Sequence, residues 1–338
     1  MLSSTLVLAA GAGKLSWLTM LAFSIMWIIG VYAPLTHWQS GTPAFAKYNQ
    51  GLSGVTNNNI GWMSAGNPLG AGTSTGYGVF DHAGAHHVLM SAGAASLALT
   101  TLMGGLKTAP AASAPTTPTS ALWAFFGLAA YIVYGDPNSM SGGTGPSMVN
   151  LFMATSTAIL TAIVFDVVLS VKGLGKGEPT QASVLRALIT GVVSVSAGAS
   201  LISPMWAAFF GFFAVLGLFT LDLLLTRVGL LGLSTGSVFS TYFLGAAISS
   251  GLTGLFTNAS YGGTGAGSFY NNSIQLGRQC AGISVVLLVS VVGTTVIYGF
   301  LLAVSKAFGN KTMTLDAEAA APAEKPLTAA VPAGESAA

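Results

Sequence analysis

Long apolar stretches, separated by short polar or glycine-rich connections, make up most of this chain. Eight of these stretches hold about 20 predominantly apolar residues, the length at which an α-helix crosses the hydrocarbon core of a bilayer. Because a helix pairs its backbone hydrogen-bonding groups internally, such a stretch is stable in lipid. The pattern predicts an all-α polytopic membrane protein. Its spans are expected near residues 15–34, 82–104, 119–135, 147–170, 183–202, 206–226, 236–257 and 279–305.

Composition points to the same class. Of the 338 residues, 6% are charged and 52% are hydrophobic, with a mean hydropathy of +0.72, whereas a soluble domain carries about 25% charged residues. The net charge of +2 and the lack of a basic run exclude nucleic-acid binding. Cys280 is the single cysteine, so no intrachain disulfide can form. The glycine-rich runs 69–78 and 262–267 lack the context of a nucleotide-binding loop, and no cofactor is expected.

Basic residues are distributed unevenly between the two ends of the spans. If Lys14 lies inside and the spans alternate, the outer side receives two basic residues, Lys47 and Arg278. This bias is the one that orients membrane proteins, with basic residues kept inside. The inner side collects the other nine, which are Lys14, Lys107, Lys172, Lys176, Arg186, Arg227, Lys306, Lys311 and Lys325.

The connections divide the chain into a transmembrane helical bundle, residues 1–310, two long outer loops and a tail. The loops, residues 41–78 and 258–278, are rich in Gly, Asn and Ser, and both are longer than ordinary connections. The last segment, residues 311–338, is rich in Ala, Pro and Glu, and we expect it to be a disordered inner-side tail. Residues 1–14 carry no positive charge ahead of their apolar run, so they are not a signal peptide.

Five short motifs, in order along the chain, follow a recognisable pattern. Residues 32–38 read YAPLTHW and residues 81–93 read DHAGAHHVLMSAG, similar to Y-x-P-x-A-H-W and D-F-A-G-G-x-V-V-H-x-N-A-G. Residues 191–204 are similar to G-L-V-A-I-T-P-A-A-G-F-V-x-P. Residues 237–245, SVFSTYFLG, follow D-V-F-x-V-H-G-x-G, and residues 275–279, QLGRQ, follow Q-L-G-x-Q. Together these motifs resemble the ammonium transporter, methylammonium permease and Rhesus family.

The resemblance extends over about residues 5–306 and implies an ammonium-transporter-like helical bundle lacking the first spans. The family has eleven spans, and this chain aligns from inside the third one onward. Either the sequence is a fragment of a longer protein, or the protein is a reduced form with about eight spans. The resemblance also implies a homo-oligomer, which is a trimer in the family.

Several positions that carry transport in the family are substituted here. Leu89 and Tyr242 stand where the resemblance places the two pore histidines. The outer cage tryptophan falls at Ser40, the cage phenylalanine at Tyr134 and the cage serine at Asn138. In the family, as the resemblance implies, this cage attracts ammonium, which loses its proton and crosses a hydrophobic pore as ammonia past two imidazoles.

The substitutions change the proton chemistry expected at the pore. Leu89 can neither donate nor accept a proton, and the Tyr242 hydroxyl hardly ionises near neutral pH. Tyr242 is also open to a structural interpretation, in which its hydroxyl bonds to a neighbouring helix. Tyr134 keeps an aromatic face that attracts cations. A histidine relay is therefore not expected, whereas a hydrophobic path for neutral ammonia remains conceivable.

Asp81 and three histidines form the most polar cluster in the spans. Asp81 opens the second span, where a carboxylate caps the helix and favours its dipole, and it would also add negative potential at the mouth. His82 and His86 lie one turn apart with His87 beside them, so a shared metal is one interpretation. No second ligand cluster occurs in the sequence, so we favour a polar outer mouth and predict no metal site.

Two functions remain after these arguments. The first is an integral multi-pass membrane protein of the ammonium transporter family that passes ammonium or ammonia through an altered pore. The alternative is a non-transporting structural subunit of a larger membrane complex, held by other membrane subunits or by copies of itself. An enzyme is not expected, because no catalytic constellation lies at membrane depth.

Overall fold

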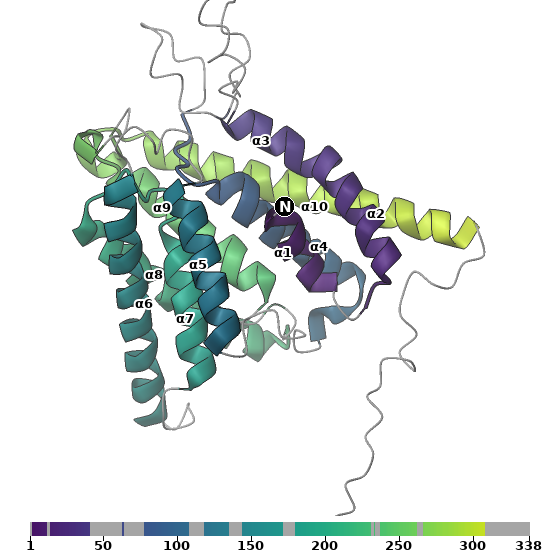
Figure 1. Ribbon diagram of the computed structural model, residues 1–338, viewed down its shortest axis with the longest axis horizontal. Helices are drawn as coiled ribbons and strands as arrows, with labels where there is room; N and C mark the ends of the chain where they lie inside the picture. The colour runs from purple at the N-terminus through teal and green to yellow at the C-terminus, as the bar shows by residue number, and fades with distance from the viewer. Residues whose placement is uncertain are drawn as a thin grey trace, which may run out of the picture.

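The computed structural model describes residues 2–11, 14–40, 63, 78–107, 118–134, 144–171, 180–230, 233, 237–261 and 266–307. Regular structure within those ranges is helical (Figure 1). The longer elements are α1 (Leu2–Gly11), α2 (Trp17–Trp27), α3 (Ala33–Ser40), α4 (Ser91–Leu102), α5 (Pro118–Tyr134), α6 (Thr144–Val171), α7 (Gln181–Ser194), α8 (Pro204–Val228), α9 (Gly245–Phe256) and α10 (Gln275–Ala307). Three π-helical segments, η1 (Ile28–Tyr32), η2 (Ala85–Met90) and η6 (Phe239–Leu244), continue directly into α3, α4 and α9.

Several helices have the length and composition of membrane spans. Five meet both criteria within the described residues: Trp17–Gln39, Thr144–Val168, Pro204–Val228, Phe239–Phe256 and Gln275–Ala307. The helices α1, α5 and α7 are apolar but shorter. The expected all-α, multi-pass membrane class is confirmed. The division into eight spans stays a prediction, and the tail 311–338 and most of the loop 41–78 lie outside the described residues.

Two segments differ from a simple division into long apolar helices. The apolar stretch 183–202 is helical only to Ser194, and turns follow through residue 201. Serine hydroxyls there bond to local carbonyls, for example Ser196 Oγ to Val193 O at 2.7 Å, which competes with continued helix. The short helix α1 packs on α4, although its ten residues are too few to cross a bilayer.

The helices form two groups that share a centre. In Figure 1, α5, α6, α7 and α8 lie together as one bundle, while α10 runs across the other part of the molecule beside α4. The segment η6–α9 contacts α7 and α8 on one side and α4 and α10 on the other. The middle of the molecule is therefore built from η2–α4 and η6–α9, which are enclosed by the remaining helices.

Gly93 allows these two central segments to approach closely. A Cβ atom added to Gly93 would lie 2.6 Å from Phe243 Cβ and 2.8 Å from Phe243 Cα, and closer still to the backbone nitrogen of Phe243. Backbone atoms cannot move aside as the end of a flexible side chain can. Without a drive from water, contact between small residues and a neighbouring backbone is a main way for helices to associate in a membrane. Gly93 thus sets the spacing of α4 and η6.

We predict that Gly93→Val separates α4 from η6 and lowers stability by about 1–3 kcal/mol, the usual cost of overpacking a core. Thermal unfolding of the detergent-solubilised protein, followed by tryptophan fluorescence, measures the change. Gly127→Val is the matched control, since nothing lies within 4 Å of a Cβ at that position in α5. Equal melting temperatures for the two variants would contradict the close approach.

Candidate functional site

The two central segments have the same construction. Each consists of six π-helical residues followed by twelve α-helical residues, η2–α4 in one case and η6–α9 in the other. π-helical turns are rare and occur frequently at functional sites, because they widen the helix and redirect its side chains. The segments η2 and η6 contact each other, so the two wide turns meet inside the molecule.

The first turn of each central segment is capped by a side chain from just before it. Asp81 accepts hydrogen bonds from the backbone N–H groups of Ala85 at 2.7 Å and His86 at 3.0 Å. Ser237 accepts one from Ser240 N at 3.1 Å. The interpretation of Asp81 as a helix cap is confirmed. The two caps differ in charge, so a carboxylate stands at the start of η2 and a neutral hydroxyl at the start of η6.

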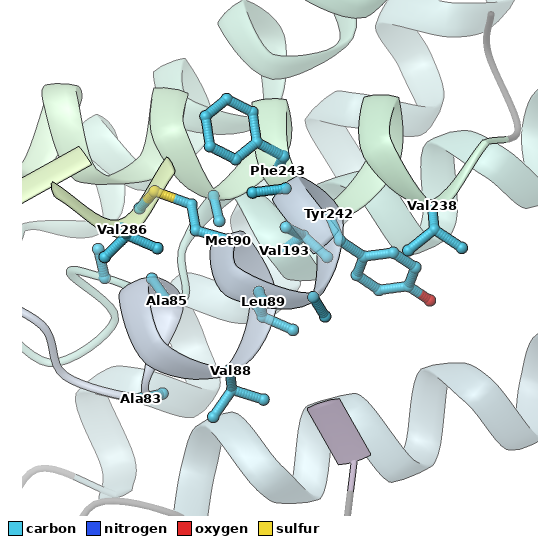
Figure 2. Close-up of a cluster of buried hydrophobic side chains, with 14 of the residues drawn as sticks. Ala83, Ala85, Val88, Leu89, Met90, Val193, Val238, Tyr242, Phe243 and Val286 are labelled. Atoms are coloured by element: carbon cyan, nitrogen blue, oxygen red, sulfur yellow. The ribbon is translucent and has the colours of Figure 1, made fainter. Parts of the chain in front are cut away.

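Leu89 and Tyr242 lie in one hydrophobic cluster where η2 meets η6 (Figure 2). Leu89 is completely buried and Tyr242 keeps 7% of its surface exposed. Apolar side chains surround the pair, among them Val88, Val193 and Val238. The junction is therefore apolar, and Leu89 contributes no group that can exchange a proton.

The Tyr242 hydroxyl points away from Leu89. In Figure 2 the ring extends beside Leu89 toward Val238, with the oxygen at its far side. The sequence suggested that a neighbouring helix would bond to this hydroxyl, but within the described ranges no hydrogen bond to it forms. Tyr242 therefore acts at this junction mainly through its ring.

A cluster of ionisable and aromatic side chains lies beside the start of η2. We name it the Asp81–His87 cluster: Asp81, His87, Tyr32 and Tyr131. The Nδ1 atom of His87 lies 3.7 Å from Asp81 Oδ2, and its ring centre lies 6.1 Å from that of Tyr32. A Cβ added to Gly84 would lie 3.1 Å from His87 Cε1 and 2.5 Å from the Tyr131 hydroxyl. Gly84 also has a φ of +71°, so glycine is required there by both space and conformation.

His86 also contacts Asp81 and belongs to a fully enclosed network. Its Nδ1 lies 3.3 Å from Asp81 Oδ2, and its Nε2 lies 3.0 Å from Ser250 Oγ. The Ser250 hydroxyl also donates to Gln279 Oε1 at 3.3 Å. Gln279 Nε2 in turn donates to the carbonyl of Phe80 at 3.0 Å. The network joins η2, α9 and α10.

His82 points to a third set of partners. Its Nδ1 lies 2.8 Å from Ser200 Oγ and its Nε2 lies 3.1 Å from Ser147 Oγ, so both ring nitrogens are bonded. Its backbone N–H donates to Ala197 O at 2.8 Å. His82 thus ties the start of η2 to α6 and to the turns after α7. His86 and His87 both face Asp81, whereas His82 does not. No three His, Cys, Asp or Glu side chains in the described part of the chain are arranged to hold a metal.

The described residues do not test whether the three residues aligned with the outer cage come together. Ser40 is the last residue of α3, and Tyr134 is the last residue of α5, where 71% of its surface is exposed. Asn138 lies outside the described residues. The cage assignments therefore stay predictions.

Sequence reasoning did not find the contribution of Tyr32 and Tyr131 to the site. Tyr32 was part of a signature motif, but a motif does not say what its side chain faces. The contact of Tyr32 with His87 joins residues 55 positions apart. Tyr131 lies on the same helix as the cage position Tyr134, but Tyr131 itself was given no role. A run of two histidines next to an aspartate was the one available signal, and it was correct only as a sign of a polar cluster.

Comparison with known sequences identifies the family of this chain. The sequence model of the Ammonium Transporter Family matches residues 1–311. The ammonium transporter of Aquifex aeolicus (strain VF5) is 26% identical over 309 residues, and that of Bacillus subtilis (strain 168) is 24% identical over 298 residues. These matches cover 90% and 84% of this chain, but 63% and 62% of the relatives. The chain thus spans less than two thirds of their length.

Solved structures with the same fold include Mep2 proteins from two organisms. Candida albicans Mep2 superimposes with a TM-score of 0.69 at 21% identity, and the match covers 94% of this chain and 64% of that one. Saccharomyces cerevisiae Mep2 gives 0.69 at 20% identity, with the same coverage. A sensor Amt protein gives 0.70 at 17% identity, covering 94% and 71% of the two chains. The fold is shared with these structures and the family model extends over residues 1–311, so this chain is a member of the ammonium transporter family.

Proposed function

We propose that this chain lets ammonia cross the membrane as a neutral molecule, along the junction between η2 and η6. The observation that carries the proposal is the pair Leu89 and Tyr242, which lie together in an apolar cluster at the positions aligned with the family's two histidines. The relatives from Aquifex aeolicus and Bacillus subtilis are named ammonium transporters. Their names support ammonium as the ion that reaches this protein from solution.

The apolar junction favours the neutral species on energetic grounds. An ion taken to the middle of a bilayer loses its hydration shell at a cost of several kcal/mol, and Leu89 offers neither charge nor hydrogen bond to compensate. Ammonia is small and uncharged, so the same environment costs it far less. Transport along this route requires that ammonium leave its proton behind before it reaches Leu89.

A non-transporting structural subunit is the second candidate. The observation that favours it is the complete burial of Leu89 among apolar neighbours, since a junction packed in this way resembles an ordinary hydrophobic core. In that case the central segments η2–α4 and η6–α9 would serve only to hold the fold, and the protein would act through partners in the membrane.

Uptake measurements separate the two candidates. We expect the full chain, produced in a microbial host that lacks its own ammonium transporters, to restore growth on low ammonium and to accumulate labelled methylammonium. The purified chain in proteoliposomes should show the same uptake. If both assays show no uptake while the protein co-purifies with other membrane subunits, the structural role is correct and the conduction proposal is wrong.

We further predict that Tyr242→Phe retains the uptake rate of the unmodified chain. The variant deletes the hydroxyl and keeps the ring, and the proposal assigns no proton step to that hydroxyl. Initial rates of methylammonium uptake in proteoliposomes measure the effect, with the melting temperature as a control for folding. A loss comparable with removing a general acid or base, about a hundredfold or more, would show that Tyr242 carries protons.

A further inference from the structure

His87 differs from the other histidines in how its ring is engaged. The sequence contains four histidines. Of these, His82 has both ring nitrogens bonded to serines, His86 is completely buried with its Nε2 bonded to Ser250, and His37 is exposed near the end of α3. The Nδ1 atoms of His86 and His87 both lack a hydrogen-bond partner within the described residues. His87 differs from His86 in keeping 9% of its surface exposed, whereas His86 is completely buried.

Opposing effects act on the charged form of His87. Burial and the neighbouring His86 disfavour the imidazolium form, whereas the carboxylate of Asp81, with Oδ2 at 3.7 Å from Nδ1, favours a proton on that nitrogen. The side chain of Asp81 is 1% exposed, so this charge is little screened by water. With Nδ1 protonated, Nε2 carries the lone pair, and 11% of the His87 side chain remains exposed for contact with a solute.

Aromatic rings complete the surroundings of His87. The ring of Tyr32 lies 6.1 Å away at an interplanar angle of 52°, and the Tyr131 hydroxyl borders the same space beside Gly84. Aromatic faces and a nearby carboxylate both attract a small cation such as ammonium. In the sequence, His87 lies two residues before Leu89 in η2.

We propose that His87, held beside Asp81, is the base that takes the proton from ammonium before ammonia passes Leu89. The inference rests on the proposed conduction of ammonia. An N–H bond of ammonium breaks, its electron pair stays on ammonia, and the proton bonds to Nε2 of neutral His87. The imidazolium then returns the proton to water on the side from which ammonium came. No oxidant, reductant or further reactant is needed, and neutral ammonia alone continues inward.

The titratable groups around His87 are limited. On its own segment these are Asp81 and His86, and the elements packed against it supply Tyr32 from η1 and Tyr131 from α5. Neither tyrosine is a base near neutral pH. Asp81 is occupied by the two backbone N–H groups of Ala85 and His86, so it positions His87 and is not the group that meets ammonium.

The test compares initial rates of methylammonium uptake in proteoliposomes that contain the full chain. We expect His87→Ala and His87→Gln each to lower the rate by about a hundredfold, the usual contribution of a general base. Imidazole added to the outer solution should restore uptake to His87→Ala, whose missing ring leaves room for it, and not to His87→Gln. His37→Gln, which removes an exposed imidazole, should leave uptake unchanged.

Each outcome of this test either supports or overturns the role of His87 as a base. Rescue of His87→Ala by imidazole supports the role as a base if the melting temperature is unchanged by imidazole, since repair of packing would raise it. Full uptake by either His87 variant would overturn the inference while leaving conduction intact. A loss without rescue, at an unchanged melting temperature, would also overturn it and assign His87 to packing. No uptake by the unmodified chain would instead defeat the proposed function itself, and with it any role for His87.

Discussion

The close approach of α4 to η6 fixes the centre of this protein. Gly93 lies against the backbone of Phe243, and any larger side chain would push the two central segments apart. Because that contact joins a helix to a π-helical turn, it also sets how Leu89 of η2 and Tyr242 of η6 face the same cluster. Water provides no drive for helices to associate within lipid, so backbone contact of this kind determines which side chains can meet.

Most polar side chains around this centre are hydrogen-bonded, which offsets the cost of burying them. His82 and His86 are tied to serines from distant helices, and Asp81 is held by two backbone N–H groups of η2. Bonded in this way, such groups are tolerated in a medium where an unpaired one is costly. Several buried polar atoms within the described residues have no hydrogen-bond partner, among them Nδ1 of His87, Nδ1 of His86 and Oδ1 of Asn150. Polar groups that break the usual rule of hydrogen-bond pairing are expected at functional sites.

Features that depend on residues close together in the sequence could be predicted, whereas features that depend on contacts between distant residues could not. Helical class and membrane location depend on local composition, and these predictions are confirmed. The capping role of Asp81 is also local, as its partners are four and five residues away. The end of α7 at Ser194 was missed because serine hydroxyls outcompete an otherwise apolar helix. The contact of His87 with Tyr32 depends on packing between segments far apart in the chain, which no local pattern specifies.

The central claim is that the substrate passes Leu89 without its proton. The most direct measurement is the charge moved per molecule of labelled methylammonium, obtained from currents and uptake on the same proteoliposomes. Crossing as the neutral amine, with the proton left outside, predicts uptake accompanied by no net charge. A full elementary charge for each molecule taken up would contradict the account, since it would mean that a proton crosses the apolar junction together with the substrate.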